Sequence, residues 1–202
     1  FFGLAVASSL AVVSGSWLLA QLLDWRLVLR QPIAALRRPV FVSWGGGLLL
    51  PPVFWLVCSL AGFEPLAVLD AAARTLPAGH ALGRLGCLSY GCCFGRPTRG
   101  ALGITYHDPR SKAVRIANLQ GIRLHPAALY EAGLDLAIVL VVNTAAALDA
   151  PLGMPSALVM VLYGAGRFGI EFLKDNRDRF VVGSLAINHF VSAALVCAGL
   201  LL

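Results

Sequence analysis

Charged side chains are scarce in this chain of 202 residues, and their scarcity limits the classes of protein to which it can belong. Only 13% of the residues are charged and 58% are hydrophobic, whereas ordinary globular domains are about 25% charged. A soluble fold of this length has too little interior to bury so much apolar surface, and disordered chains are far more polar. The composition therefore excludes both classes and predicts a membrane protein.

Several features of other protein classes are also missing. The chain has no internal repeat and no low-complexity tract. Its first apolar stretch has no basic segment before it and no small-residue cleavage site after it, so we expect a spanning helix rather than a signal peptide. The chain begins with Phe1 instead of Met, from which we expect that a leading piece is missing. Five cysteines in so apolar a chain do not indicate a secreted disulfide framework.

Six apolar stretches approach the length of about 20 residues that a helix needs to cross a bilayer. They are residues 1–23, 43–62, 66–86, 126–148, 155–173 and 181–202. The long connection 87–124 is too polar to span, and we expect it to form a small irregular or β-containing cap at one membrane face. The sequence thus predicts an all-α, multi-pass transmembrane helix bundle. Residues 1–202 would form a single transmembrane domain, with 87–124 as an extramembrane cap or loop insertion between spans three and four.

The net charge of +6 indicates which partners the chain prefers. Its basic residues are scattered through short loops instead of forming one polar domain, which favours lipid headgroups or anionic substrates over nucleic acid. Of the 16 Lys and Arg residues, 13 lie in three loops that share one side of a six-span bundle. The positive-inside bias would place that side in the cytoplasm.

Charged residues inside spans are costly and are therefore functional candidates. The first group is His80 and Arg84, followed closely by Gly86, Cys87 and Gly91. A guanidinium at the end of an apolar helix suits a lipid phosphate, because it binds oxygen pairs and keeps its charge. The alternative is an interfacial arginine whose side chain merely extends to the headgroups.

Two further groups lie at 125–131 and 163–171. Their polar members are His125, Tyr130, Glu131, Tyr163, Arg167 and Glu171. The last three are spaced i, i+4, i+8 and so share one helix face, where Arg167 and Glu171 could also simply pair with each other. Two arginines, two glutamates and two tyrosines from three helices favour one buried site for an anionic headgroup.

The cysteines allow a different interpretation. Cys87, Cys92 and Cys93, together with His80, offer the donors of a tetrahedral zinc site, although their spacing is not a standard one for zinc. A redox-active or lipidated thiol is a second possibility. We favour a third, that the cysteines are small packing residues, and therefore expect no metal and no cofactor.

The three groups, in this order, resemble the prolipoprotein diacylglyceryl transferases. The resemblance lies in 83–87 with Gly91, in 125–131 and in 163–172, and it extends from about residue 41 to the end. Such enzymes are multi-pass proteins of the bacterial cytoplasmic (inner) membrane. They move the diacylglyceryl group of phosphatidylglycerol to the lipobox cysteine thiol of a preprolipoprotein, forming a thioether and releasing glycerol phosphate. The resemblance implies these two substrates as partners, together with membrane lipids and no nucleic acid.

The resemblance also implies roles for the candidate residues. Arg84 and Arg167 would neutralise the phosphate, Glu171 would fix Arg167, and His80 could replace a missing base for the thiol. The residues expected to bind substrate are Tyr163, His125, Tyr130, Glu131, Gly86, Cys87 and Gly91.

The chain departs from the family pattern at several positions. Trp44 replaces a histidine, Cys87 an asparagine, Cys92 a glutamate and Ala128 a glutamine. The family's first helix, with its functional tyrosine, has no evident counterpart, and the family places the long connection on the outer side, against the charge bias. Two other interpretations therefore stay open: a silent homologue that binds anionic lipid, and a membrane thiol or metal protein built on the cysteines and His80.

Overall fold

The computed structural model describes residues 2–36, 43–175, 181–182 and 185–202. Within them the regular secondary structure is helical apart from one short β-ribbon. It divides into two compact units, residues 1–68 and 69–202, which are described separately.

The first unit is built from two long helices. Its helices are α1 (Phe2–Leu23), α2 (Trp25–Arg30), α3 (Pro32–Leu36), α4 (Ser43–Ala61) and the first turn of α5 (Pro65–Ala73). Helix α1 packs along α4, which continues across Pro51 and Pro52 in its interior. Trp44, one of the positions that depart from the pattern the sequence resembles, lies in the first turn of α4, and its side chain is outside the described part of the structure.

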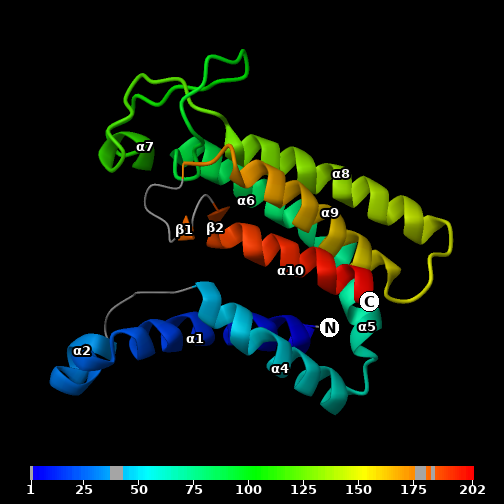
Figure 1. Cartoon of the computed structure of the whole chain (residues 1–202). Coiled ribbons are helices and arrows are strands. Elements are labelled where there is room, and N and C mark those ends of the chain that lie inside the picture. The colour runs from blue at the N-terminus through cyan, green and yellow to red at the C-terminus, as the bar shows by residue number, and fades with distance from the viewer. Residues whose placement is uncertain (1, 37–42, 176–180, 183–184) are drawn as a thin grey trace. The chain divides into compact units, whose positions relative to one another are not determined.

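The second unit carries all the other candidate residues. Its helices and strands are α6 (Leu76–Tyr90), α7 (Lys112–Arg115), α8 (Ala127–Ala147), α9 (Met154–Glu171), β1 (Val181–Val182), β2 (Leu185–Ala186) and α10 (Ile187–Leu201). Helix α6 packs on α8, α8 on α9, and α9 on α10, so four helices run side by side (Figure 1). The two strands pair antiparallel, with Val181 opposite Ala186.

The structure confirms a helical membrane protein but does not support the count of six spans. By length and composition, two described helices could cross a membrane, at Val6–Leu23 and Ala127–Ala147, or three if α4 and α5 form one broken span. The predicted span 66–86 is divided into α5 and α6, because Pro77 lies in the first turn of α6 and favours a helix start there. The predicted span 181–202 begins with the β-ribbon, which leaves only 15 residues for α10.

Two charged residues of the predicted span 66–86, Asp70 and Arg74, form hydrogen bonds that hold neighbouring helices together. The Asp70 carboxylate accepts hydrogen bonds from the Gly153 amide (2.7 Å), the Ser156 amide (3.0 Å) and the Ser156 hydroxyl (2.5 Å), so it caps the start of α9. Arg74 Nε donates to Asn143 Oδ1 (3.2 Å), and Asn143 Nδ2 donates back to the Arg74 carbonyl (3.0 Å). This exchange ties the break between α5 and α6 to α8.

Helix α9 lies very close to α10, which fixes the position of its polar face. A Cβ atom at Gly164 would lie 2.7 Å from the Ser192 carbonyl oxygen, so only glycine allows this approach. Gly166 faces the Leu134 side chain of α8 in the same manner, whereas Gly169 faces open space. Gly164 thus permits close packing against the backbone of α10, and Gly166 against a side chain of α8.

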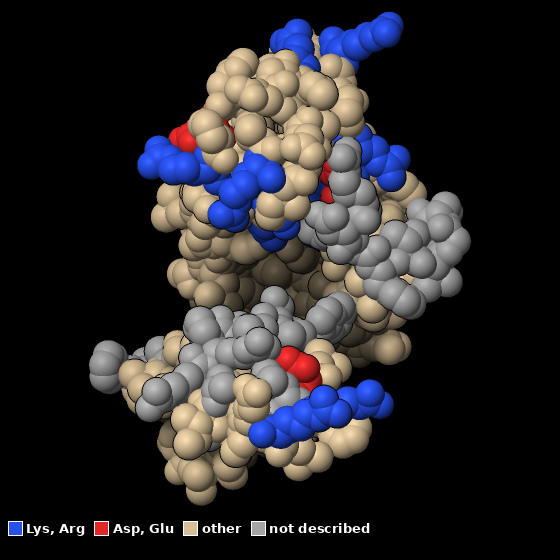
Figure 2. All heavy atoms as spheres, turned by 90° about the vertical axis from the view of Figure 1, so that its left-hand side faces the viewer, with Lys and Arg blue, Asp and Glu red and all other residues tan. Residues whose placement is uncertain are grey.

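The connection between α6 and α8 packs around a small core of its own. Ala113, Ala117, Leu119 and Leu124 are buried together, with Phe94 and Tyr106 against them. Isolated β-bridges join Gly95 to Lys174 and Leu124 to both Pro97 and Ile104. Figure 2 shows Lys and Arg side chains gathered on this end of the unit. The connection is thus an irregular layer that covers the ends of α6, α8 and α9.

Candidate functional site

The charged candidates come from helix ends that meet beneath the connection. Arg84 lies in the second half of α6, Glu131 near the start of α8, and Arg167 and Glu171 at the end of α9, with Lys174 just beyond it. Because α8 runs opposite to α6 and α9, all five belong to the same end of the bundle (Figure 1).

Glu131 is the centre of this arrangement. Its side chain is completely buried, and its Oε2 atom lies 2.6 Å from Arg84 Nε. Its Oε1 atom lies 2.9 Å from Lys174 Nζ and 3.6 Å from Arg167 Nη1. One carboxylate thus connects cations from α6, from α9 and from the segment that follows α9.

A second carboxylate holds Arg167 from the other side. Arg167 Nη1 forms an ion pair with Glu171, whose Oε1 atom accepts a hydrogen bond from Asn188 Nδ2 at 3.0 Å. The expected i, i+4 pair therefore forms, and Arg167 joins it to Glu131. We call Arg84, Glu131, Arg167, Glu171 and Lys174 the buried charge cluster.

The three cations of the buried charge cluster differ in how far they are exposed. The Arg84 side chain is 19% exposed, compared with 10% for Arg167 and 2% for Lys174. An anion would therefore reach Arg84 first, with the charge of Arg167 behind it, which suits a single phosphate group.

A histidine and an acid lie beside the cluster. His80 Nδ1 is 2.7 Å from Asp135 Oδ2, and Asp135 is 1% exposed whereas the His80 side chain is 39% exposed. The rings of His80 and Tyr163 pack edge to face. The Tyr163 hydroxyl also interacts with Arg84. The carboxylate bound to Nδ1 fixes the orientation of the imidazole and leaves Nε2 pointing away from Asp135. A histidine that acts as a general base is held in this way.

The remaining candidates do not join the cluster through any described contact. His125 Nδ1 lies 3.2 Å from the Tyr130 hydroxyl, so these two residues pair with each other. Gly91 ends α6 with a φ of 66°, a conformation that favours glycine, and its amide bonds the Cys87 and Leu88 carbonyls. Gly86 lines a neighbouring cavity.

The three cysteines come together at the end of α6. The sulfur atoms of Cys87, Cys92 and Cys93 all lie within 4.8 Å of one another, and no disulfide joins them. His80 is not part of this group, so the four donors that the sequence analysis weighed as an alternative zinc site do not assemble. Burial, followed by hydrogen bonding to Cys87 and the charge of Cys93, raises the pKa of Cys92 to about 12. The free Cys92 thiol is therefore protonated at neutral pH, which argues against a reactive thiolate.

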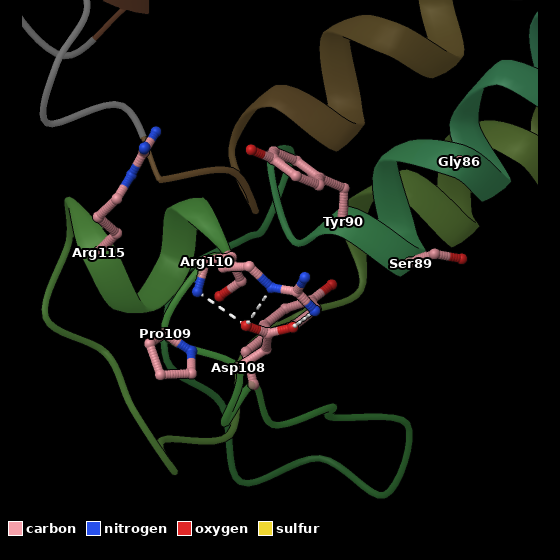
Figure 3. Close-up of a pocket in the computed structure, with 9 residues that line it drawn as sticks. Gly86, Ser89, Tyr90, Asp108, Pro109, Arg110 and Arg115 are labelled. Carbon is pink, nitrogen blue, oxygen red and sulfur yellow. Dashed lines mark hydrogen bonds and ion pairs between the residues drawn. The ribbon is translucent and has the colours of Figure 1, made fainter.

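A cavity of about 700 Å³ lies between the end of α6 and the connection (Figure 3). It is lined by Gly86, Ser89, Tyr90, Tyr106, Asp108, Pro109, Arg110, Ser111 and Arg115. The Asp108–Arg110 ion pair on its wall spans 3.0 Å, and the Tyr106 hydroxyl donates to the Leu88 carbonyl at 2.9 Å. The cavity thus combines aromatic, acidic and basic groups close to the cysteines.

Three residues of the site were missed from the sequence. Asp135 follows Glu131 by four residues on α8, and Lys174 follows Glu171 by three, so helical spacing could have indicated both. Asn188 reaches Glu171 from α10 across the fold. No local pattern indicates that contact.

The chain is similar to known enzymes over nearly its whole length. Residues 4–202 match the family described as prolipoprotein diacylglyceryl transferase. The chain is 26% identical over 209 residues to phosphatidylglycerol–prolipoprotein diacylglyceryl transferase 2 of Clostridium perfringens, covering 100% of this chain and 77% of that one. The enzyme of the same name, without the numeral, from Clostridium tetani is 24% identical over 98% of this chain and 78% of its own length. The match begins well before residue 41, from which the resemblance in sequence extends, and the chain belongs to the prolipoprotein diacylglyceryl transferase family.

Proposed function

We propose that this chain transfers the diacylglyceryl group of phosphatidylglycerol to the lipobox cysteine of preprolipoproteins in the bacterial cytoplasmic membrane. The observation that carries the proposal is the buried charge cluster, in which Arg84 and Arg167 both lie on Glu131 and Arg84 stays partly exposed. The names of the relatives supply the reaction. The partners would be phosphatidylglycerol, signal peptides with a lipobox cysteine and the surrounding membrane lipids.

The reaction makes two demands on the site. A cysteine thiol must lose its proton and attack a glycerol carbon, and the carbon–oxygen bond to phosphate must break so that glycerol phosphate leaves. Arg84 would bind the phosphate, and Arg167, held by Glu171, would add a second positive charge as negative charge develops on the leaving group. Tyr163, which interacts with Arg84, would orient the headgroup.

The overall activity can be tested with the purified full chain in liposomes. A lipobox peptide should gain the mass of one diacylglyceryl group when phosphatidylglycerol is present, and no mass when phosphatidylcholine replaces it. Saturable binding of phosphatidylglycerol without any mass gain would contradict transfer. It would favour the silent homologue, for which Cys87 and Cys92 at departing positions are the argument.

We assign the proton transfer to His80, positioned by Asp135. A His80→Ala variant is expected to lower the rate of transfer about 10²-fold or more, since general bases contribute at least that much. The variant should also lose the fall in rate at low pH that protonation of a base produces. An Asp135→Asn variant should lower the rate about 10-fold, because the imidazole loses its fixed orientation.

His107 provides the matched control for this assignment. It is an exposed histidine of the connection, and His107→Ala should transfer at the rate of the unaltered chain. An unchanged rate and pH profile in His80→Ala would exclude His80 as the base.

A further inference from the structure

The end of α6 gathers three thiols that the proposed transfer does not use. Gly91 turns the chain with its positive φ, and the Cys92 amide then donates to the Cys87 carbonyl at 3.2 Å. This turn folds Cys92 and Cys93 back over Cys87, although four residues separate the first and second cysteines in sequence. The spacing of the three cysteines is not a standard one for a metal site, yet the fold brings their sulfur atoms within 4.8 Å of one another.

The separations of the sulfur atoms fit one metal ion. With metal–sulfur bonds of about 2.3 Å, thiolates around one ion lie about 3.8 Å apart in tetrahedral and about 4.0 Å apart in trigonal geometry. Cys92 Sγ and Cys93 Sγ are 3.9 Å apart, and no pair among the three exceeds 4.8 Å. Small side-chain rotations would therefore place all three sulfur atoms at bonding distance from a common centre.

We propose that Cys87, Cys92 and Cys93 form a binding site for a thiophilic cation such as Zn²⁺. The donor set selects the metal class, because thiolates prefer zinc, cadmium and cuprous copper, whereas magnesium and calcium require oxygen. Within the described residues, no further His, Cys, Asp or Glu joins the three sulfur atoms. The fourth position of a tetrahedral ion is thus left to water or a small ligand.

The surroundings supply charge balance. A divalent ion with three thiolates carries one negative charge, and Arg84 Nη1 lies 3.7 Å from Cys93 Sγ. Arg84 belongs to the buried charge cluster as well, so the proposed metal site adjoins the proposed phosphate site without sharing its ligands.

The surroundings also leave a path for the ion. All three cysteines are half-buried, unlike the fully buried Cys58. The Tyr106 hydroxyl donates a hydrogen bond to the Leu88 carbonyl. The Tyr106 side chain also interacts with Cys92 and Cys93 and lines the cavity of about 700 Å³. Tyr106 thus lies between the cavity and the thiols, which gives a cation a route to them from the side of the connection.

The test is a metal titration of the full chain in detergent, after reduction and a count of its five free thiols. Added Cd²⁺ should produce thiolate-to-metal charge-transfer absorption that saturates at one equivalent, and Zn²⁺ should displace it. Cys87→Ser and Cys92→Ser should each weaken binding at least about 10-fold, because loss of a ligand exceeds the effect of losing an outer partner. Cys197→Ser, which alters an exposed cysteine on α10, should bind like the unaltered chain.

A second measurement needs no substitution and so does not depend on the folding of a variant. Bound Zn²⁺ should protect Cys87, Cys92 and Cys93 from maleimide labelling and leave the labelling of Cys197 unchanged, as peptide mass spectrometry would show. The proposal is wrong if the reduced chain shows no saturable Cd²⁺ absorption, or if Zn²⁺ protects none of the three. Equal affinity in the Cys92→Ser and Cys197→Ser variants would also overturn it.

Discussion

An Arg84→Ala variant is expected to lose diacylglyceryl transfer by about 10²- to 10³-fold, the usual effect of removing one group that stabilises developing negative charge. Arg84 is the most exposed cation of the buried charge cluster, and its side chain enters from α6 while the other two cations lie at or beyond the end of α9. The loss should be functional rather than structural, because Glu131 keeps Lys174 and Arg167 as partners. The initial rate of mass gain by a lipobox peptide measures the effect.

Two further variants define what Arg84 contributes. Arg84→Lys keeps the charge but not the planar set of donors, so its rate should lie between those of Arg84→Ala and the unaltered chain. Arg99→Ala removes an exposed arginine of the connection and should leave the rate unchanged. Normal transfer by Arg84→Ala would remove Arg84 from the phosphate site, and an equal loss in Arg99→Ala would indicate a general effect of surface charge.

The buried charge cluster was largely predictable from the sequence because charge is so scarce in this chain. In an apolar helix a charged residue such as Glu131 or Arg167 needs a polar partner. Its presence in the sequence therefore predicts that a second polar group lies beside it. The i, i+4 spacing of Arg167 and Glu171 indicated that pair, and the structure forms it. The long-range partners remained open, because apolar helices pack in many orientations and their sequence does not select one.

The break between α5 and α6 shows why the number of spans could not be predicted in the same way. Composition treats 66–86 as one apolar stretch, yet the exchange between Arg74 and Asn143 of α8 stabilises the break at a residue 69 positions away in sequence. Asp70 is also charged and lies in this apolar stretch, yet its bonds to Gly153 and Ser156 make it a cap of helix α9. A polar residue in an apolar stretch thus predicts that it has a polar contact. Only the fold shows whether that contact stabilises the structure or belongs to a functional site.

The contacts of Glu131 lead to the largest expected effect on stability. A Glu131→Gln variant keeps the shape of the side chain but removes the carboxylate that faces Arg84, Arg167 and Lys174. Glu131 is completely buried and Lys174 nearly so, and breaking a buried ion pair from one side costs about 3–5 kcal/mol because the other charge stays buried. The free energy of unfolding in detergent, followed by circular dichroism against denaturant, should fall by that amount.

A double variant separates the effect of charge from that of shape. Adding Lys174→Met to Glu131→Gln removes one of the buried cations, so it should recover part of the lost stability even though it deletes a further contact. Asp108→Asn, which removes a carboxylate from the exposed pair with Arg110, should unfold like the unaltered chain. If Glu131→Gln is as stable as Asp108→Asn, Glu131 does not organise the buried charge cluster. If the double variant is less stable than Glu131→Gln alone, packing rather than charge governs this end of the bundle.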